Sequence, residues 1–164
     1  MSIERPLRRL DLRVYQHATE DREKVVAALR LVAGDGEPAA RRAEGYYGNP
    51  IVIWETGVSG RADLEGFWGR LRDAGLCPGL EENLEERTNE AGELFIRFDK
   101  QEAVAGRLAL SQGDDVVSAR GRVLATVKGQ EKRADRDLAI EIMRAFLREL
   151  EKKKAQGAGR EAQG

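Results

Sequence analysis

Apolar and polar side chains alternate in Leu10-Asp11-Leu12-Arg13-Val14-Tyr15, and this stretch decides the fold class. Because successive side chains of a strand point to opposite faces, its apolar residues share one side and its polar residues the other. Such alternation predicts a strand that buries one face and leaves the other in water. Strands of this kind are typical of antiparallel sheets with one open face.

Further strands are predicted outward from this stretch, with glycine- and asparagine-containing turns beside them. The predicted strands cover 51–54, 94–98, a brief extended piece at 108–110, and a long strand at 116–127. In the long strand, Ser118, Arg120, Arg122 and Thr126 face away from the apolar side. Part of the acidic run Glu81–Glu93 is also expected to form a strand, with a hairpin turn at 89–92 leading into 94–98.

Helical spacing of apolar residues separates these strands. Thr19 is predicted to cap a helix that ends near residue 34, and a second helix covers about 61–74. Asp99 is predicted to cap a short helix, and a long helix covers about 132–154. The fold class is therefore α+β: a mainly antiparallel sheet with helices packed on one face and a long C-terminal helix. One domain is expected over 1–154 and a flexible tail over 155–164.

The composition restricts the function classes. The chain has 164 residues, 41% hydrophobic and 35% charged, with a net charge of -1. A balanced charge excludes a uniformly basic nucleic-acid binder, so any RNA contact requires a local basic surface. A single cysteine, Cys77, allows no intrachain disulfide and indicates a reducing cytoplasm. No apolar run reaches the length of a membrane span and no apolar signal core is present, so neither membrane association nor export is expected.

Catalytic signatures are missing from the sequence. With one histidine, His17, and one cysteine, no Cys/His metal set can form, and neither a Walker A sequence nor a strand-following G-x-G-x-x-G occurs. We therefore expect a protein without catalytic residues, bound metal or cofactor. A small hydrolase that uses His17 with an Asp or Glu remains the least supported alternative.

If the strands pair as predicted, the open face of the sheet carries arginines and aromatic rings. Arg9, Arg13, Tyr15, Phe95, Arg97, Arg120 and Arg122 belong to this set. Arginines supply charge and planar donors for phosphates, and aromatic rings offer stacking surfaces for bases. The alternative is that these residues only form the wet side of a sheet and pair with neighbouring glutamates.

Two other regions are candidates for RNA contact. Residues 120–160 carry 12 Lys/Arg against 6 Asp/Glu, although lysines at the end of a helix are also explained by its dipole. The turn Gly45-Tyr46-Tyr47-Gly48-Asn49-Pro50 brings two tyrosines beside glycines. These rings either pack back on the sheet or form an exposed contact surface.

Three stretches of the chain, in this order, resemble a known family. They are His17-Ala18-Thr19-Glu20-Asp21, Gly45-Tyr46-Tyr47-Gly48-Asn49-Pro50-Ile51 and Ile96-Arg97-Phe98-Asp99-Lys100-Gln101-Glu102-Ala103. Together with Asp114-Asp115-Val116-Val117 they resemble the archaeal predicted RNA-binding proteins described as exosome-associated, over about Leu7 to Val127. The resemblance implies RNA binding and a fold similar to that of the large-subunit ribosomal protein that grips the smallest ribosomal RNA. It carries over no catalytic residue.

The leading hypothesis is a non-catalytic cytoplasmic RNA-binding protein, accessory to RNA processing or degradation by the exosome. Its partners would be structured or single-stranded RNA and exosome components, and a homodimer is compatible with it. The predicted RNA-binding residues are Arg9, Arg13, Tyr46, Tyr47, Arg97, Lys100, Arg120 and Arg122. The alternative is a protein–protein adaptor or dimerising structural subunit that uses the acidic segment or the C-terminal helix.

Overall fold

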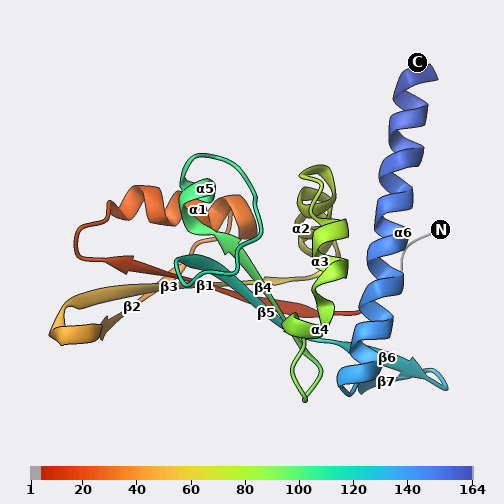
Figure 1. The fold of residues 1–164 in the computed structure, drawn as a ribbon, viewed down its shortest axis with the longest axis horizontal. Helices are drawn as coiled ribbons and strands as arrows, with labels where there is room; N and C mark the ends of the chain where they lie inside the picture. Colours follow the sequence, from red (N-terminus) through yellow and green to blue (C-terminus); the bar gives the residue numbers. More distant parts are fainter. Residues whose placement is uncertain (1–4, 164) are drawn as a thin grey trace.

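A five-stranded antiparallel sheet forms the centre of the molecule (Figure 1). The computed structural model describes the backbone of residues 5–163 and the side chains of residues 5–45 and 47–153. In spatial order the strands are β2 (Ala39–Glu44), β3 (Pro50–Ser59), β1 (Arg9–His17), β5 (Val116–Arg122) and β4 (Glu93–Asp99). The predicted α+β class, with a mainly antiparallel sheet, is confirmed.

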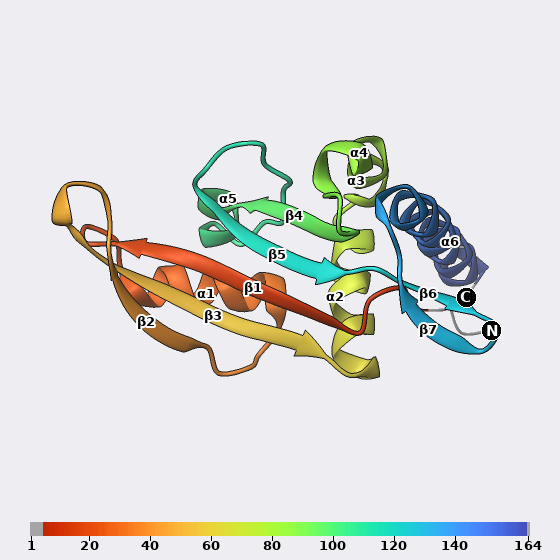
Figure 2. The same ribbon diagram turned by 90° about the horizontal axis from the view of Figure 1, so that it is seen from below.

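Helices cover one face of this sheet and leave the other open, as Figure 2 shows from the open side. Behind the sheet lie α1 (Arg22–Ala33) and α2 (Arg61–Asp73), with α5 (Lys100–Val104) next to α1. Beyond one end of the sheet stand α3 (Cys77–Glu82), α4 (Leu84–Arg87) and the long α6 (Arg136–Gln163). In the described part of the chain, no helix has both the length and the apolar character of a membrane span.

The core lies between the sheet and the helices. Leu10, Leu12 and Val14 are buried there, as their alternation with polar residues predicted. Aromatic rings join the layers: Phe67 of α2 meets Phe98 of β4 edge to face at 6.2 Å, measured between ring centroids. In the same way Trp68 meets Phe146 of α6 at 5.1 Å, so the C-terminal helix packs on the core.

Two helix caps test the sequence predictions. Asp99 caps α5, because its carboxylate accepts a hydrogen bond from the backbone N–H of Glu102 at 2.9 Å, and this prediction is confirmed. The prediction that Thr19 caps α1 is wrong: Asp21 is the cap and accepts from the N–H of Glu23 at 2.9 Å. The turn before α1 is longer than predicted because the Glu20 carboxylate folds back and accepts a hydrogen bond from the backbone N–H of His17.

The acidic segment forms helices where a strand was predicted. Leu80 and Leu84 are four residues apart and both buried, so α3 and α4 present a helical apolar stripe that the many glutamates obscured. Only the end of the segment is extended, where Thr88 bridges to Leu94 across the predicted turn. The Asn89 side chain stabilises this turn by accepting from the N–H of Glu93 at 2.9 Å.

The long strand predicted at 116–127 is two strands. β5 ends at Arg122, and β6 (Leu124–Val127) pairs with β7 (Gln130–Arg133) in a separate hairpin. The break lies where the N-terminal segment crosses: the N–H of Leu124 donates to the carbonyl of Pro6 at 2.8 Å. A side chain at Gly121 would collide there with Leu7.

The C-terminal helix differs from its predicted limits at both ends. Because β7 uses residues 130–133, α6 begins at Arg136 instead of near Lys132. Its backbone continues to Gln163, past the predicted end at 154. The flexible tail predicted at 155–164 falls on residues whose side chains lie outside the described part of the chain, and it stays a prediction.

Candidate nucleic-acid interface

The strand register places the predicted arginines together on the open face. Arg13 of β1 lies opposite Ser118 of β5, which lies opposite Arg97 of β4. The next row contains Asp11, Arg120 and Phe95, again side by side across the same three strands. Because neighbours in such rows have Cβ atoms about 4.5–5.5 Å apart, the side chains form one continuous surface. The predicted sharing of one face by Arg9, Arg13, Arg97, Arg120 and Arg122 is confirmed.

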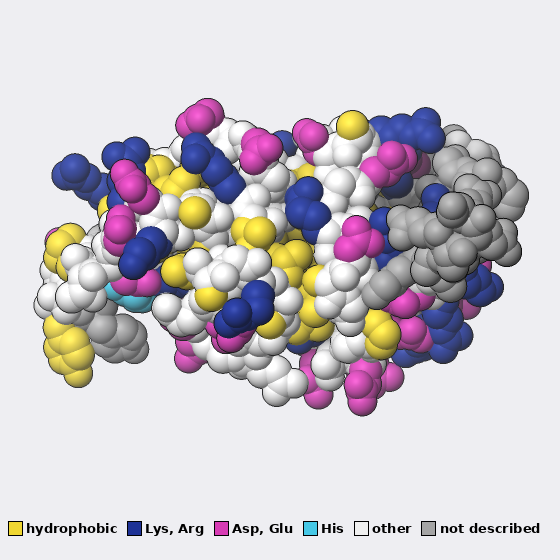
Figure 3. All heavy atoms as spheres, turned by 90° about the horizontal axis from the view of Figure 1, so that it is seen from above, with side chains coloured by type: hydrophobic (Ala, Val, Ile, Leu, Met, Phe, Trp, Pro, Cys, Tyr) yellow, Lys and Arg dark blue, Asp and Glu magenta, His cyan; other side chains and the backbone are white. Residues whose placement is uncertain are grey.

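The middle of this face is hollowed. The hollow has a volume of about 440 Å³. Its lining includes Arg9, Asp11, Arg13, Tyr15, Glu55, Gly57, Phe95, Ser118 and Arg120. The helix-covered side of the molecule is different, with positive and negative side chains interspersed over it (Figure 3). The open face therefore combines a concave shape with a concentration of arginine.

Carboxylates on the open face hold some of these arginines in place. Arg9 Nε donates to Asp11 Oδ1 at 2.8 Å, and Glu93 Oε2 lies 3.7 Å from Arg120 Nε. Glu55 lies between two arginines, with Oε1 2.9 Å from Arg41 Nη2 and 3.9 Å from Arg13 Nε. These exposed pairs contribute little to stability, but they orient the guanidinium groups.

Arginine remains in excess on this face. Sequence reasoning missed Arg41, which faces the same side from β2 because it lies opposite Ile53; Ala39-Ala40-Arg41-Arg42 shows no alternation that could have revealed it. Six arginines thus share the open face with the carboxylates Asp11, Glu55 and Glu93. Among the described residues, no carboxylate lies within 4.0 Å of Arg97 or Arg122. Arg97 is exposed, so its charge is accessible to an anionic ligand, whereas Arg122 is part-buried and its Nε is buried without a hydrogen-bond partner.

Tyr15 affects the pKa of Arg13, and Gly57 affects the position of the Arg9 side chain. A hydrogen bond with the Tyr15 side chain raises the pKa of Arg13, against the opposing effect of burial, and Glu55 adds to the rise. Arg13 therefore stays charged throughout the physiological pH range. A Cβ at Gly57 would lie 2.5 Å from Arg9 Nη2. Because Gly57 has no side chain, the Arg9 guanidinium can lie against β3 at this position.

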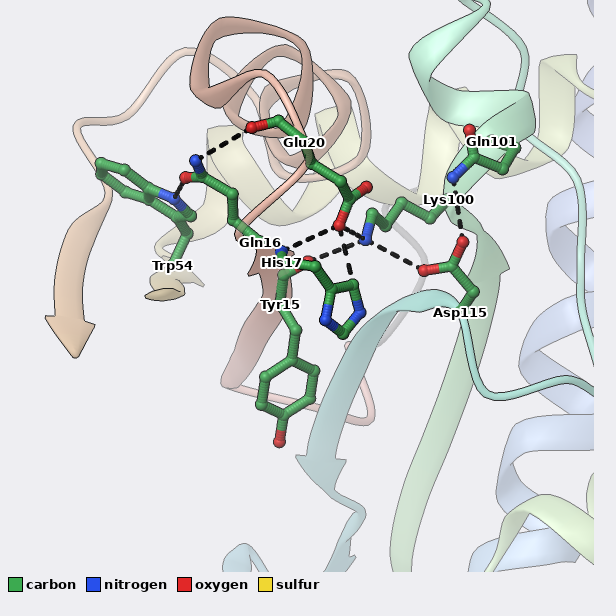
Figure 4. Close-up of polar contacts among 8 residues, drawn as sticks. All are labelled: Tyr15, Gln16, His17, Glu20, Trp54, Lys100, Gln101 and Asp115. Carbon is green, nitrogen blue, oxygen red and sulfur yellow. Dashed lines mark hydrogen bonds and ion pairs between the residues drawn. The ribbon is translucent and has the colours of Figure 1, made fainter. Parts of the chain in front are cut away.

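The prediction that Lys100 contacts RNA from an exposed position is wrong: its side chain is 1% exposed. As the first residue of α5, directly after β4, it points inward below the end of the sheet (Figure 4). Its Nζ donates to the backbone oxygen of Tyr15 at 2.8 Å and lies 2.7 Å from Glu20 Oε1. Asp115 Oδ1 completes the set at 2.9 Å. Lys100 therefore forms a buried network of hydrogen bonds and ion pairs inside the fold, and it is not a phosphate contact.

The segments that carry the family resemblance meet around this lysine. Gln101 Nε2 donates to Asp115 Oδ2 at 2.9 Å, which joins the start of α5 to the start of β5. His17 lies opposite Ile51 in the register, so the segment that ends at Ile51 reaches the same end of the sheet. Burial acts to raise the pKa of Asp115, but hydrogen bonds from Gln101 and Lys100 outweigh it and lower that pKa below its ordinary value. The segments that resemble the family thus form a polar network around Lys100 beneath the open face. We call this network the Lys100 anchor.

The tyrosine turn lies at the tip of the connection between β2 and β3. Tyr47 is 97% exposed and has a φ of 61°, a left-handed conformation that tyrosine rarely adopts. Of the two predicted alternatives, the structure supports an exposed contact surface for Tyr47. The side chain of Tyr46 lies outside the described residues.

The remaining candidates from the sequence are a metal-ligating cluster, His17 and the basic C-terminal region. Among the described residues, no cluster of three or more His, Cys, Asp or Glu side chains could hold a metal ion. His17 Nε2 lies 4.0 Å from Glu20 Oε1, but that carboxylate oxygen is already engaged by Lys100. In the basic C-terminal region, Lys152 pairs with Glu149 at 3.2 Å on the exposed side of α6.

An α+β sheet whose uncovered face carries arginines and aromatic rings offers the groups that RNA-binding modules use for phosphate and base contacts. Residues 9–123 match the protein family described as RNA binding, and the chain belongs to this family. It is 37% identical to the RNA-binding protein PAB1135 of Pyrococcus abyssi over 125 residues, which cover 70% of this chain and 80% of that protein.

Other relatives extend this similarity. The protein MJ0213 of Methanocaldococcus jannaschii is 28% identical over 147 residues, which cover 83% of this chain and 98% of that protein. A solved structure of a DUF54 protein from Methanothermobacter thermautotrophicus superposes with a TM-score of 0.74 at 32% identity, covering 86% of this chain and 98% of the other. The sheet and the helices around it are therefore features that this chain shares with archaeal relatives.

Proposed function

We propose that this protein binds RNA through the open face of its sheet. The observation that carries the proposal is the gathering of six arginines and the rings of Tyr15 and Phe95 on one hollowed surface. Membership of the RNA-binding family and the name of the Pyrococcus relative support it. In this proposal the guanidinium groups contact phosphates and the rings stack on unpaired bases. Tyr47 adds a ring at the end of the sheet.

The proposal includes a cellular role. We expect a non-catalytic protein of the cytoplasm that is accessory to RNA processing or degradation by the exosome. Contacts made mainly to phosphates give affinity with modest sequence preference, which suits an accessory protein that handles many RNAs. The Lys100 ion pairs with Glu20 and Asp115 are compatible with a structural role for this end of the sheet.

The test is fluorescence anisotropy with labelled single-stranded and hairpin RNAs of about 12 nucleotides. The variant is Arg9/Arg97/Arg120→Ala, which removes three exposed arginines from three strands of the open face. Its control is Lys24/Arg61/Arg107→Ala, which removes three equally exposed charges outside that face. Far-ultraviolet circular dichroism and thermal melting establish that both variants are folded.

The account expects saturable binding that weakens steeply between about 50 and 200 mM salt. The open-face variant should lose at least about 10-fold in affinity, and its slope of log K against log salt should fall by about 2, at roughly 0.7 per single-strand phosphate contact. The control should match the unmodified protein. Equal loss in both variants would refute the open face as the site, and no binding even at low salt would refute RNA binding by the isolated chain.

A second candidate function is a protein–protein adaptor or a homodimer. The observation that favours it is a groove of about 1160 Å³ between α6 and the β6–β7 hairpin, where Leu138 is 38% exposed and Ile142 lines the wall. Light scattering coupled to size exclusion decides the dimer: a mass near twice 18.2 kDa that Leu138→Glu restores to the monomer would support it. A monomer at all concentrations would exclude the homodimer.

A further inference from the structure

One row of the open face carries three different chemical groups side by side. Across β3, β1, β5 and β4 the row contains Gly57, Asp11, Arg120 and Phe95. All of them line the hollow. At about 440 Å³ the hollow is within the roughly 300–1,000 Å³ range of small-ligand sites. The row thus offers a carboxylate, a guanidinium and an aromatic ring to one ligand.

The carboxylate of Asp11 needs an explanation on a surface that attracts phosphates. A carboxylate repels phosphate, so its presence in the lining of the hollow lowers the affinity for the RNA backbone. Arg9, lying across Gly57, holds Asp11 by one hydrogen bond of 2.8 Å to Oδ1. A carboxylate has about four lone-pair sites, so most of its acceptor capacity remains. Asp11 is therefore an acceptor that lines the space where a ligand would lie.

We propose that the hollow binds the base of an unpaired guanosine; this rests on the proposed function, because the base belongs to an RNA held by the same face. Asp11 accepts hydrogen bonds from guanine N1–H and the N2 amino group. Arg120 donates to O6 and N7, the bidentate contact that arginine makes with guanine. The Phe95 ring provides apolar contact for the plane of the base.

The other bases fit this row less well. Adenine presents a donor at N6 beside the acceptor N7, so the Arg120 fork meets a donor. Cytosine and uracil have no N7, and their pairing edges offer the Asp11 carboxylate one donor group each, the N4 amino group or N3–H, with acceptors beside it. Guanine alone combines an edge of two adjacent acceptors with an edge of two adjacent donors. A site with one guanidinium and one carboxylate therefore selects guanine.

The test uses oligouridines of about 12 nucleotides with one central guanosine, adenosine, cytidine, inosine or 7-deazaguanosine. Affinity is measured by fluorescence anisotropy against the all-uridine strand. The guanosine strand should bind roughly 10-fold more tightly than the adenosine strand. Inosine lacks the N2 amino group and 7-deazaguanosine lacks N7, so each should lose much of this advantage.

Three variants localise the effect. Asp11→Asn and Arg120→Lys should each abolish the guanosine preference while both still bind oligouridine, because lysine keeps the charge but not the planar fork. Asp73→Asn, an exposed aspartate at the end of α2, should keep the preference. Salt-sensitive binding of all strands with equal affinity would overturn the guanosine site and leave the proposed function standing. Preference that survives in Asp11→Asn and Arg120→Lys would also overturn it, and a failure of every strand to bind would overturn both.

Discussion

Lys100 Nζ lies 2.7 Å from Glu20 Oε1, although 80 residues separate them in the chain. The same ammonium group binds the Tyr15 carbonyl and Asp115, so it joins β1, the turn before α1, the start of α5 and the approach to β5. A buried charge of this kind is tolerated only when its partners are complete. The anchor therefore fixes the end of the sheet whose open face carries the arginines.

Replacing Lys100 by methionine should lower the free energy of unfolding by about 3 kcal/mol, because it leaves the Glu20 carboxylate and the Tyr15 carbonyl without their buried partner. Urea denaturation followed by tryptophan fluorescence measures the loss. Lys24→Met makes the same chemical change at an exposed position of α1 and should stay within about 0.5 kcal/mol. A Lys100 variant as stable as the Lys24 variant would contradict the anchor.

Asp115 should make stability depend on pH in the acid range. Its folded-state pKa lies below the ordinary value of 3.8, so its ionised form stabilises the fold above that pH. This contribution is lost as the pH falls through the folded-state pKa. The difference in free energy of unfolding between the unmodified protein and Asp115→Asn should therefore shrink from neutral pH to about pH 3. A difference that grows on acidification would contradict the assignment.

The Gly57→Ala substitution should lower RNA affinity while changing stability only slightly. The new methyl group would press on the Arg9 guanidinium, a flexible end that can move away, so stability should change by no more than about 1 kcal/mol. RNA affinity should fall because Arg9 leaves its position over β3. Gly69→Ala on α2 introduces the same methyl group with ordinary contacts and should leave affinity unchanged. Unchanged affinity in Gly57→Ala would show that the position of Arg9 is unimportant.

Removing the exposed ring of Tyr47 should weaken RNA binding. Stacking of one base on an aromatic side chain is worth about 1–3 kcal/mol, so Tyr47→Ala should lose roughly 10-fold in affinity. Tyr47→Phe keeps the ring and should bind as the unmodified protein does. If the alanine variant binds equally well, the turn between β2 and β3 lies outside the interface.

The sequence could predict the open face because local alternation determines it. Leu10, Leu12 and Val14 define the buried side of β1, and this assigns Arg9 and Arg13 to the other side without knowledge of the partners. Arg97 and Arg120 follow by the same argument in their own strands. For these residues, the two-residue alternation in the sequence agrees with the burial seen in the structure.

Tertiary contacts decided the features that sequence reasoning missed. Lys100 continues the buried series Leu94, Ile96 and Phe98, but the sequence does not reveal its partners Glu20 and Asp115, which reach it only in the folded chain. The break after β5 depends on Leu7, which packs against Gly121 from more than a hundred residues away in the chain. The exposed Arg41 was missed because an edge strand in water needs no apolar alternation.

The most direct test of RNA binding by the open face is a nuclear magnetic resonance titration of the arginine Nε–Hε signals with unlabelled oligouridine. At 18.2 kDa the protein is small enough for well-resolved spectra. The account predicts that the signals of Arg9, Arg97 and Arg120 shift with one common dissociation constant, whereas those of Arg61 and Arg107 stay in place. Shifts confined to α6 and the β6–β7 hairpin, with the open-face arginines unchanged, would contradict it.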